Sequence, residues 1–152
     1  MFKHTKMASL KGRTTNNELI RTARNKNVPL SWVGFKDVLK NQLVRKNSLY
    51  IVNMQSSPDG SGTHWICIWI GRTDAFYFDS FGVYPPEEIE IWLKRNGFKS
   101  YFMNDKEIQN IRSGYCGSYC LEFGEHMSNP RLQKLTDLAR FKLFIDKFDK
   151  NP

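Results

Sequence analysis

The sequence has no long hydrophobic run, few cysteines and no internal repeat. No apolar stretch approaches the about 20 residues that a membrane-spanning helix needs, so we expect no membrane segment. The start, Met-Phe-Lys-His-Thr-Lys, has no apolar segment of the kind found in secretory signal peptides. Three cysteines are an odd number and too few for a disulfide framework, which makes a reducing intracellular setting the expectation.

Acidic residues are scarce in the first third of the chain. Residues 1–50 contain 11 Lys and Arg against two acidic residues, a net charge of +9, whereas the remainder contains 12 against 13. A solvated basic face is the ordinary explanation, and a polyanionic partner is the functional one. The hydrophobic content of 40% over 152 residues predicts one domain, residues 1–152, with a substantial core.

Hydrophobic periodicity predicts an α+β protein. Residues 1–15 are polar, basic and without periodicity, and we interpret them as a flexible arm. Alternating or continuous apolar runs predict strands at residues 48–54, 64–70, 75–79 and 99–103. Apolar residues at three-and-four spacing predict helices at residues 16–24, 31–43, 87–96, 115–124 and 132–148.

The stretch at residues 108–124 places a cysteine at a helix start. Asn110, Ser113 and Gly114 are loop formers, so Cys116 falls in the first turn of the predicted helix. There the helix dipole and the main-chain N–H groups favour a thiolate and can stabilise an oxyanion, for which Gln109 offers a second donor. The plainer interpretation is a loop that enters a core helix with two buried cysteines.

His64 and Asp79 flank one predicted hairpin. Antiparallel partners have a constant index sum, so a hairpin with an even-length loop puts these two side chains on one face of the sheet. With a loop of residues 71–72 they are directly opposite, and with a loop of residues 71–74 they are diagonal neighbours. Either distance suits an imidazole that a carboxylate orients, as a nucleophilic thiol requires of its base.

A zinc site is the rival use of the cysteines and histidines, namely His64, Cys67, Cys116, Cys120 and His126. His64 and Cys67 differ by three positions, so on a strand they point to opposite faces. Cys67 also lies within Trp-Ile-Cys-Ile-Trp, an unsuitable setting for a zinc ligand. We therefore expect no metal site.

The ordered series Thr-His64-Trp65, Phe-Tyr-Phe-Asp79-Ser-Phe-Gly82, Gln109 and Cys116-Gly-Ser-Tyr-Cys120 resembles the adenovirus-type maturation proteases. It is also similar to the wider clan that contains the SUMO and ubiquitin-like deconjugating proteases. The resemblance covers residues 47–124. It implies a papain-like α+β fold in permuted order, in which a central mixed sheet carries histidine and acid and a buried helix carries the thiol.

The resemblance also implies roles for four residues. His64 is the general base, Asp79 orients it, Cys116 is the nucleophile, and Gln109 completes the oxyanion hole with the Cys116 main-chain amide. Two features depart from the adenoviral pattern. The acid is Asp where adenoviral enzymes commonly have Glu, and the chain lacks a cysteine between Cys67 and Cys116 through which a peptide activator could be attached.

We therefore predict a monomeric viral cysteine endopeptidase that cleaves capsid or core precursors in the virion and the infected cell, of the kind encoded by adenoviruses, virophages and related DNA elements. No cofactor is required, but DNA as a stimulating polyanion fits the basic N-terminal third. Within it, a cationic row is expected, in which Lys36 and Lys40 lie on one side of the helix from residue 31 and Arg45 and Lys46 follow at its end. The alternatives are a ubiquitin-like deconjugase and a non-enzymatic basic packaging protein of the virion.

Overall fold

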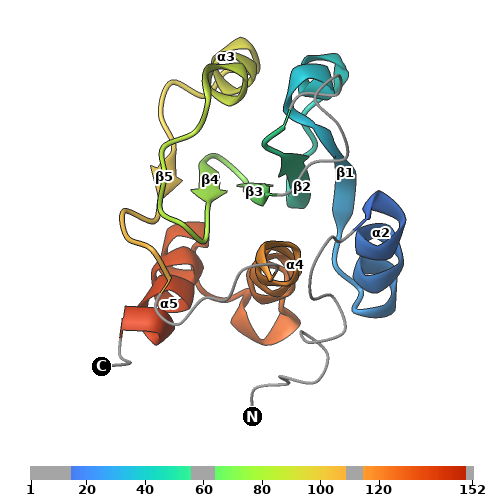
Figure 1. Cartoon of the computed structure of the whole chain (residues 1–152). Helices are drawn as coiled ribbons and strands as arrows, with labels where there is room; N and C mark the ends of the chain where they lie inside the picture. Colours follow the sequence, from blue (N-terminus) through green and yellow to red (C-terminus); the bar gives the residue numbers. More distant parts are fainter. Residues whose placement is uncertain (1–14, 56–63, 109–114, 150–152) are drawn as a thin grey trace.

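A five-stranded mixed β-sheet forms the centre of the protein (Figure 1). The computed structural model describes residues 15–55, 64–108 and 115–149. The strands lie in sequence order in the sheet: β1 (Leu30–Phe35), β2 (Ser48–Asn53), β3 (Trp65–Ile70), β4 (Ala75–Phe78) and β5 (Phe102–Met103). The outer pairs β1–β2 and β4–β5 are parallel, and the inner pairs are antiparallel. The predicted α+β class with a mixed sheet is thus confirmed.

Helices cover both faces of the sheet (Figure 1). One face packs against α2 (Asn16–Asn25), α4 (Cys116–Met127) and α5 (Asp137–Asp149). The opposite face packs against α3 (Glu87–Arg95) and the 3-10 helix η1 (Lys36–Asn41). A second 3-10 helix, η3 (Pro130–Leu132), lies between α4 and α5 in the sequence.

The central strand β3 divides the core into two halves. Each of its six residues is buried, as expected for a strand with helices on both sides. Because side chains alternate along a strand, Trp65, Cys67 and Trp69 face α4, whereas the three isoleucines between and after them face α3. The run that gave the strand its apolar appearance therefore serves two separate cores.

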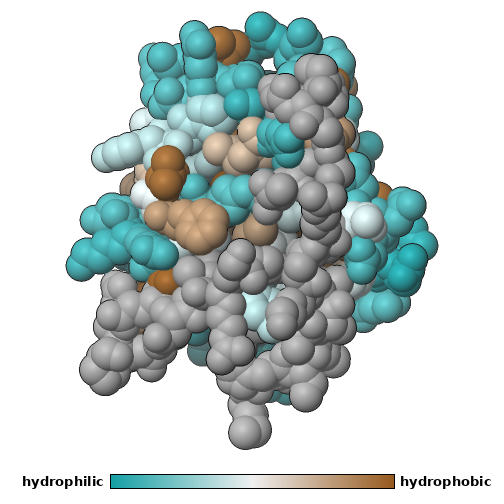
Figure 2. Space-filling view, in the orientation of Figure 1, coloured by the Kyte–Doolittle hydropathy of each residue, from teal (hydrophilic) through white to brown (hydrophobic). Residues whose placement is uncertain are grey.

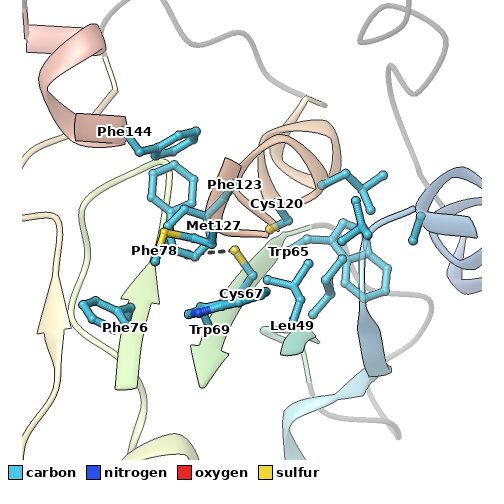
Figure 3. Close-up of a cluster of buried hydrophobic side chains, with 14 of the residues drawn as sticks. Leu49, Trp65, Cys67, Trp69, Phe76, Phe78, Cys120, Phe123, Met127 and Phe144 are labelled. Atoms are coloured by element: carbon cyan, nitrogen blue, oxygen red, sulfur yellow. Dashed lines mark hydrogen bonds between the residues drawn. The ribbon is translucent and has the colours of Figure 1, made fainter. Parts of the chain in front are cut away.

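Aromatic rings dominate the half of the core beneath α4 and α5 (Figure 3). Phe123 of α4 stacks on Phe78 of β4 with ring centroids 5.2 Å apart, and its edge meets Phe144 of α5 at the same distance. Where the face in Figure 2 is coloured, most atoms are hydrophilic and the hydrophobic ones form small separate groups.

The predicted helix beginning at Ser31 is wrong. Its first residues form strand β1, whose main chain pairs with β2, and the 3-10 helix η1 follows. Gly34 is unfavourable inside a helix. In the strand its missing side chain leaves room for the Trp32 indole, which a Cβ at that position would strike. The three-and-four spacing of apolar residues here was a coincidence of a strand followed by a turn.

The other predicted elements are present, with shifted ends. Thr15 caps α2 through a reciprocal pair of hydrogen bonds with Glu18. The last helix begins at Asp137 rather than near Leu132, because η3 and a turn occupy the residues between. The predicted arm of residues 1–15 lies outside the described residues except for Thr15.

No helix within the three described ranges is long and apolar enough to cross a bilayer.

We predict that Phe123→Ala lowers the free energy of unfolding by about 3–5 kcal/mol, because it removes a fully buried ring and leaves a cavity. Urea denaturation followed by circular dichroism measures the loss. Leu143→Ala on α5 is the control, since that side chain is 45% exposed and its loss should cost about 1 kcal/mol or less. Equal losses for the two variants would contradict a core centred on the aromatic cluster.

Candidate active site

One edge of the sheet brings His64 and Asp79 together. His64 precedes β3 directly and Asp79 follows β4 directly, and the two strands are antiparallel. Ile70 pairs with Ala75 and Cys67 with Phe78, so residues 71–74 form the turn. This register makes His64 and Asp79 diagonal neighbours, and the alternative loop of residues 71–72 is wrong.

The imidazole and the carboxylate form a short hydrogen bond. His64 Nε2 lies 2.8 Å from Asp79 Oδ1, and Asp79 is only 1% exposed. The same oxygen accepts a hydrogen bond from the main-chain N–H of Phe81 at 2.9 Å. The Phe81 ring also stacks on the imidazole, with centroids 4.5 Å apart. The ring of His64 is therefore held both in its plane and on one face.

Helix α4, which packs on one face of the sheet, places the Cys116 thiol beside this edge. Cys116 is the first residue of the helix, which follows Tyr115 as N-cap, and the sequence placed it there. Its Sγ accepts a hydrogen bond from the main-chain N–H of Trp65, the residue after His64, at 3.3 Å. The sulfur therefore lies beside the residue that follows His64.

The environment of His64 favours its protonated form. Burial by itself lowers the pKa of His64, but hydrogen bonds and charge interactions with Asp79 and Cys116 outweigh burial and raise the pKa to about 9. The second ring nitrogen, Nδ1, has no partner at ordinary hydrogen-bond distance among the described residues. The thiol is nevertheless near enough to act on the imidazole, so His64 lies between a carboxylate and a sulfur.

The other two cysteines are placed differently. Cys67 on β3 and Cys120 on α4 lie inside the aromatic cluster, and Cys67 Sγ points at the main-chain oxygen of Phe78 (Figure 3). Burial, and then the neighbouring Cys67, raise the pKa of the Cys120 thiol well above its usual range. Both side chains therefore belong to the core.

His126 lies apart from the other residues that were considered as zinc ligands. His126 Nε2 bonds the main-chain oxygen of Arg140 at 2.7 Å, near the opposite end of α4 from Cys116. Among the described residues, no group of three or more His, Cys, Asp or Glu side chains is arranged to hold a metal ion.

Two groups of expected site residues remain to be placed. Gln109 lies outside the described residues, so its role in an oxyanion hole stays a prediction. The basis of the expected cationic row is wrong, because Lys36 and Lys40 lie on a 3-10 helix, where side chains four apart point about 120° away from one another. Lys36 Nζ also lies 3.8 Å from Glu88 Oε2. Lys40, Arg45 and Lys46 are exposed.

Sequence reasoning missed three contributors to the site. The index sum of 145 from the observed pairs places Phe81 opposite His64, so the correct turn length would have predicted their contact. The main-chain N–H of Trp65 and the side chain of Asn104, which binds the main chain of Asp79, gave no signal in the sequence.

The chain is similar to a protein named Protease from Bovine adenovirus C serotype 10. The two are 30% identical over 100 residues, which cover 56% of this chain and 50% of the relative. The chain thus spans about half the length of the relative that it matches. No protein-family model matches the chain. The similarity to the adenovirus protein supports a relationship to a viral protease.

We predict that the His64 imidazole titrates near pH 9 rather than near 6.5, and that Asp79→Asn lowers this pKa, because a charged acceptor is lost. Nuclear magnetic resonance of labelled histidines measures the titration. His126 is the internal control, since burial lowers its pKa and Asp79→Asn should leave it unchanged.

The same shift has a consequence for stability. The pKa of His64 is higher in the folded protein than the unfolded value of 6.5. The contribution of the protonated imidazole to the free energy of unfolding is therefore complete below about pH 6.5, and it is lost as the pH rises through about 9. A His64 titration that Asp79→Asn does not alter would contradict the described contact.

Proposed function

We propose that the chain is a viral cysteine endopeptidase that cleaves capsid or core precursor proteins. The observation that carries this proposal is the arrangement of three side chains: the Asp79 carboxylate binds the His64 imidazole, and the Cys116 thiol at the start of α4 acts on the same imidazole. A nucleophile, a base and an orienting acid are the parts of a thiol protease. The similarity to an adenovirus protease supports the same conclusion.

The proposed reaction follows from these positions. The thiol proton of Cys116 moves to His64, and the sulfur attacks the carbonyl carbon of the substrate peptide. The imidazolium then gives this proton to the leaving amine, which departs and leaves a thioester on the sulfur. His64 then takes a proton from a water molecule, which attacks the thioester carbonyl. The carboxylic acid of the cleaved substrate leaves, and His64 returns the proton to the Cys116 sulfur.

Each neighbour of the pair assists one step. Asp79 keeps the imidazole in one orientation and stabilises its positive charge. The raised pKa of His64 favours the state in which the proton has left the sulfur. The contact between thiol and imidazole is often loose in a free enzyme and closes with substrate. As donors to the oxyanion we propose the main-chain N–H of Cys116 and the side chain of Gln109.

We predict that Cys116→Ala abolishes cleavage, whereas Cys120→Ala retains it, because Cys116 alone of these two thiols contacts the histidine site. The measurement is mass spectrometry of capsid and core precursors incubated with each protein. His64→Ala should lose more activity than Asp79→Ala, since the base moves the proton and the acid orients it.

Cys67→Ala and Cys120→Ala serve as matched controls, because both remove a buried sulfur without touching the site. Cleavage that persists in Cys116→Ala would end the protease proposal and favour a non-enzymatic packaging protein. A ubiquitin-like probe ending in Gly-Gly tests the deconjugase: labelling of Cys116 by that probe, without cleavage of capsid precursors, would replace the proposed substrate class.

We further propose that the basic first third binds DNA or another polyanion without sequence preference, which concentrates the enzyme on packaged substrates. With about four to six phosphates neutralised, log K should fall with log salt at a slope of roughly −4 to −5. Fluorescence anisotropy with labelled duplex DNA measures the slope. Glutamine substitutions should flatten it without changing hydrolysis of a short peptide; the positions are Lys36, Lys40, Arg45 and Lys46.

Lys94 and Arg95, at the end of α3, provide the matched control, since both are exposed and lie outside the basic third. Their replacement by glutamine should leave the slope unchanged. Weak binding that does not respond to salt would show a merely solvated basic face.

A further inference from the structure

Asn104 is buried at the edge of the sheet that carries His64 and Asp79. It directly follows β5, which runs parallel to β4 with Tyr77 opposite Met103. Because the carboxyl ends of parallel neighbours lie at the same edge, Asn104 lies beside Asp79. It is 2% exposed, and no step proposed above uses it.

The carboxamide of Asn104 holds both main-chain polar groups of Asp79. Its Oδ1 accepts a hydrogen bond from the Asp79 N–H at 3.1 Å, and its Nδ2 donates to the Asp79 carbonyl at 2.6 Å. Nδ2 also donates to the Lys106 carbonyl at 3.0 Å. A planar amide that binds an N–H and a C=O of one residue fixes the position and the rotation of that residue together.

The segment after Asn104 completes this support. The Ile108 N–H donates to the Ser80 carbonyl at 2.9 Å. Gly82, with a φ of 69°, allows residues 106–107 to approach so closely that a Cβ would strike their main chain. Residues 104–108 therefore pack against the turn that contains Asp79 and support it.

The side chain and the main chain of Asp79 are thus held by different partners. The Phe81 N–H and His64 fix the carboxylate oxygen, whereas Asn104 fixes the main chain from which the side chain projects. A change of the main-chain angle at Asp79 moves the carboxylate away from Nε2 even where Phe81 keeps its hydrogen bond. Asn104 is the described side chain that opposes such a change.

We propose that Asn104 is a positioning residue for the His64–Asp79 pair, acting through the main chain of Asp79. The inference deepens the proposed protease and rests on it for its effect on turnover. A carboxylate held in place keeps the imidazolium stabilised through the reaction. The plainer role for Asn104 is to bind the main-chain polar groups of a buried turn. In that role its replacement would lower the stability of the fold and leave the His64 titration unchanged.

The first experiment is a titration of His64 by nuclear magnetic resonance in wild type and Asn104→Ala. The titratable groups that act on His64 are Asp79, after β4, and Cys116, on α4. With Asp79 no longer fixed, the pKa of His64 should fall by about one unit. Asn96→Ala is the matched control: its carboxamide also binds a main-chain oxygen, at the end of α3 on the other face of the sheet. It should lower the melting temperature without moving the His64 titration.

The second experiment measures turnover of a capsid precursor peptide on protein whose folding is checked by circular dichroism. Asn104→Ala should lower kcat about 10- to 100-fold with little change in KM. Residues that hydrogen-bond and orient the ligands of metal sites show effects of this size when they are replaced. In an Asp79→Ala background the same substitution should cost less than about twofold, because the residue through which it acts is already gone.

Where Asn104→Ala does not fold, the isosteric Asn104→Asp keeps the acceptor for the Asp79 N–H and loses both donors, and it should lower kcat in the same direction. An unchanged His64 titration in folded Asn104→Ala, or an equal loss in the Asp79→Ala background, would overturn the positioning role. A wild-type protein without Cys116-dependent hydrolysis would contradict the protease instead, and the His64 titration would still decide the role of Asn104.

Discussion

The register between β3 and β4 is the constraint on which the site depends. With Ile70 opposite Ala75, His64 faces Phe81 and lies diagonal to Asp79. A shift of one residue would turn every side chain of β4 to the other face of the sheet. The far end of this hairpin is held by α5, where Asp137 Oδ2 accepts a hydrogen bond from the Arg72 N–H at 2.9 Å. A turn remote from the site thus helps to set the distance between imidazole and carboxylate.

The three cysteines of the chain lie in different environments, which give their thiols different roles. Cys67 and Cys120 face an aromatic cluster, and burial keeps the Cys120 proton on its sulfur. Cys116 is four residues before Cys120 on the same helix, yet it meets a main-chain donor and an imidazole. Helical spacing alone placed Cys116 and Cys120 on one face, whereas the helix start distinguished their chemistry.

Much of this arrangement followed from patterns in the sequence, and the failures have physical reasons. Residues 64–79 predicted a hairpin because continuous apolar runs and a polar turn leave few alternatives. The strand at Leu30–Phe35 was mistaken for a helix, because its pairing with β2 is a tertiary contact that local spacing does not report. The role of Asn104 had no pattern in the sequence, because it binds main-chain atoms of Asp79, 25 positions away. Gln109 was expected near Cys116 both from its place in the preceding loop and from the resemblance, and it lies outside the described residues.

The contact between Trp65 and Cys116 joins two parts of the site that lie far apart in the sequence. His64 and Asp79 lie 15 residues apart on one hairpin, whereas the sulfur of Cys116 reaches the same place across 51 residues and only when α4 packs on the sheet. Local contacts can form early in folding, but distant ones must first overcome the entropy of closing a long loop. The position of the sulfur relative to the imidazole is therefore set by the packing of α4 on the sheet, whereas the pairing of β3 with β4 sets the position of the carboxylate relative to the imidazole.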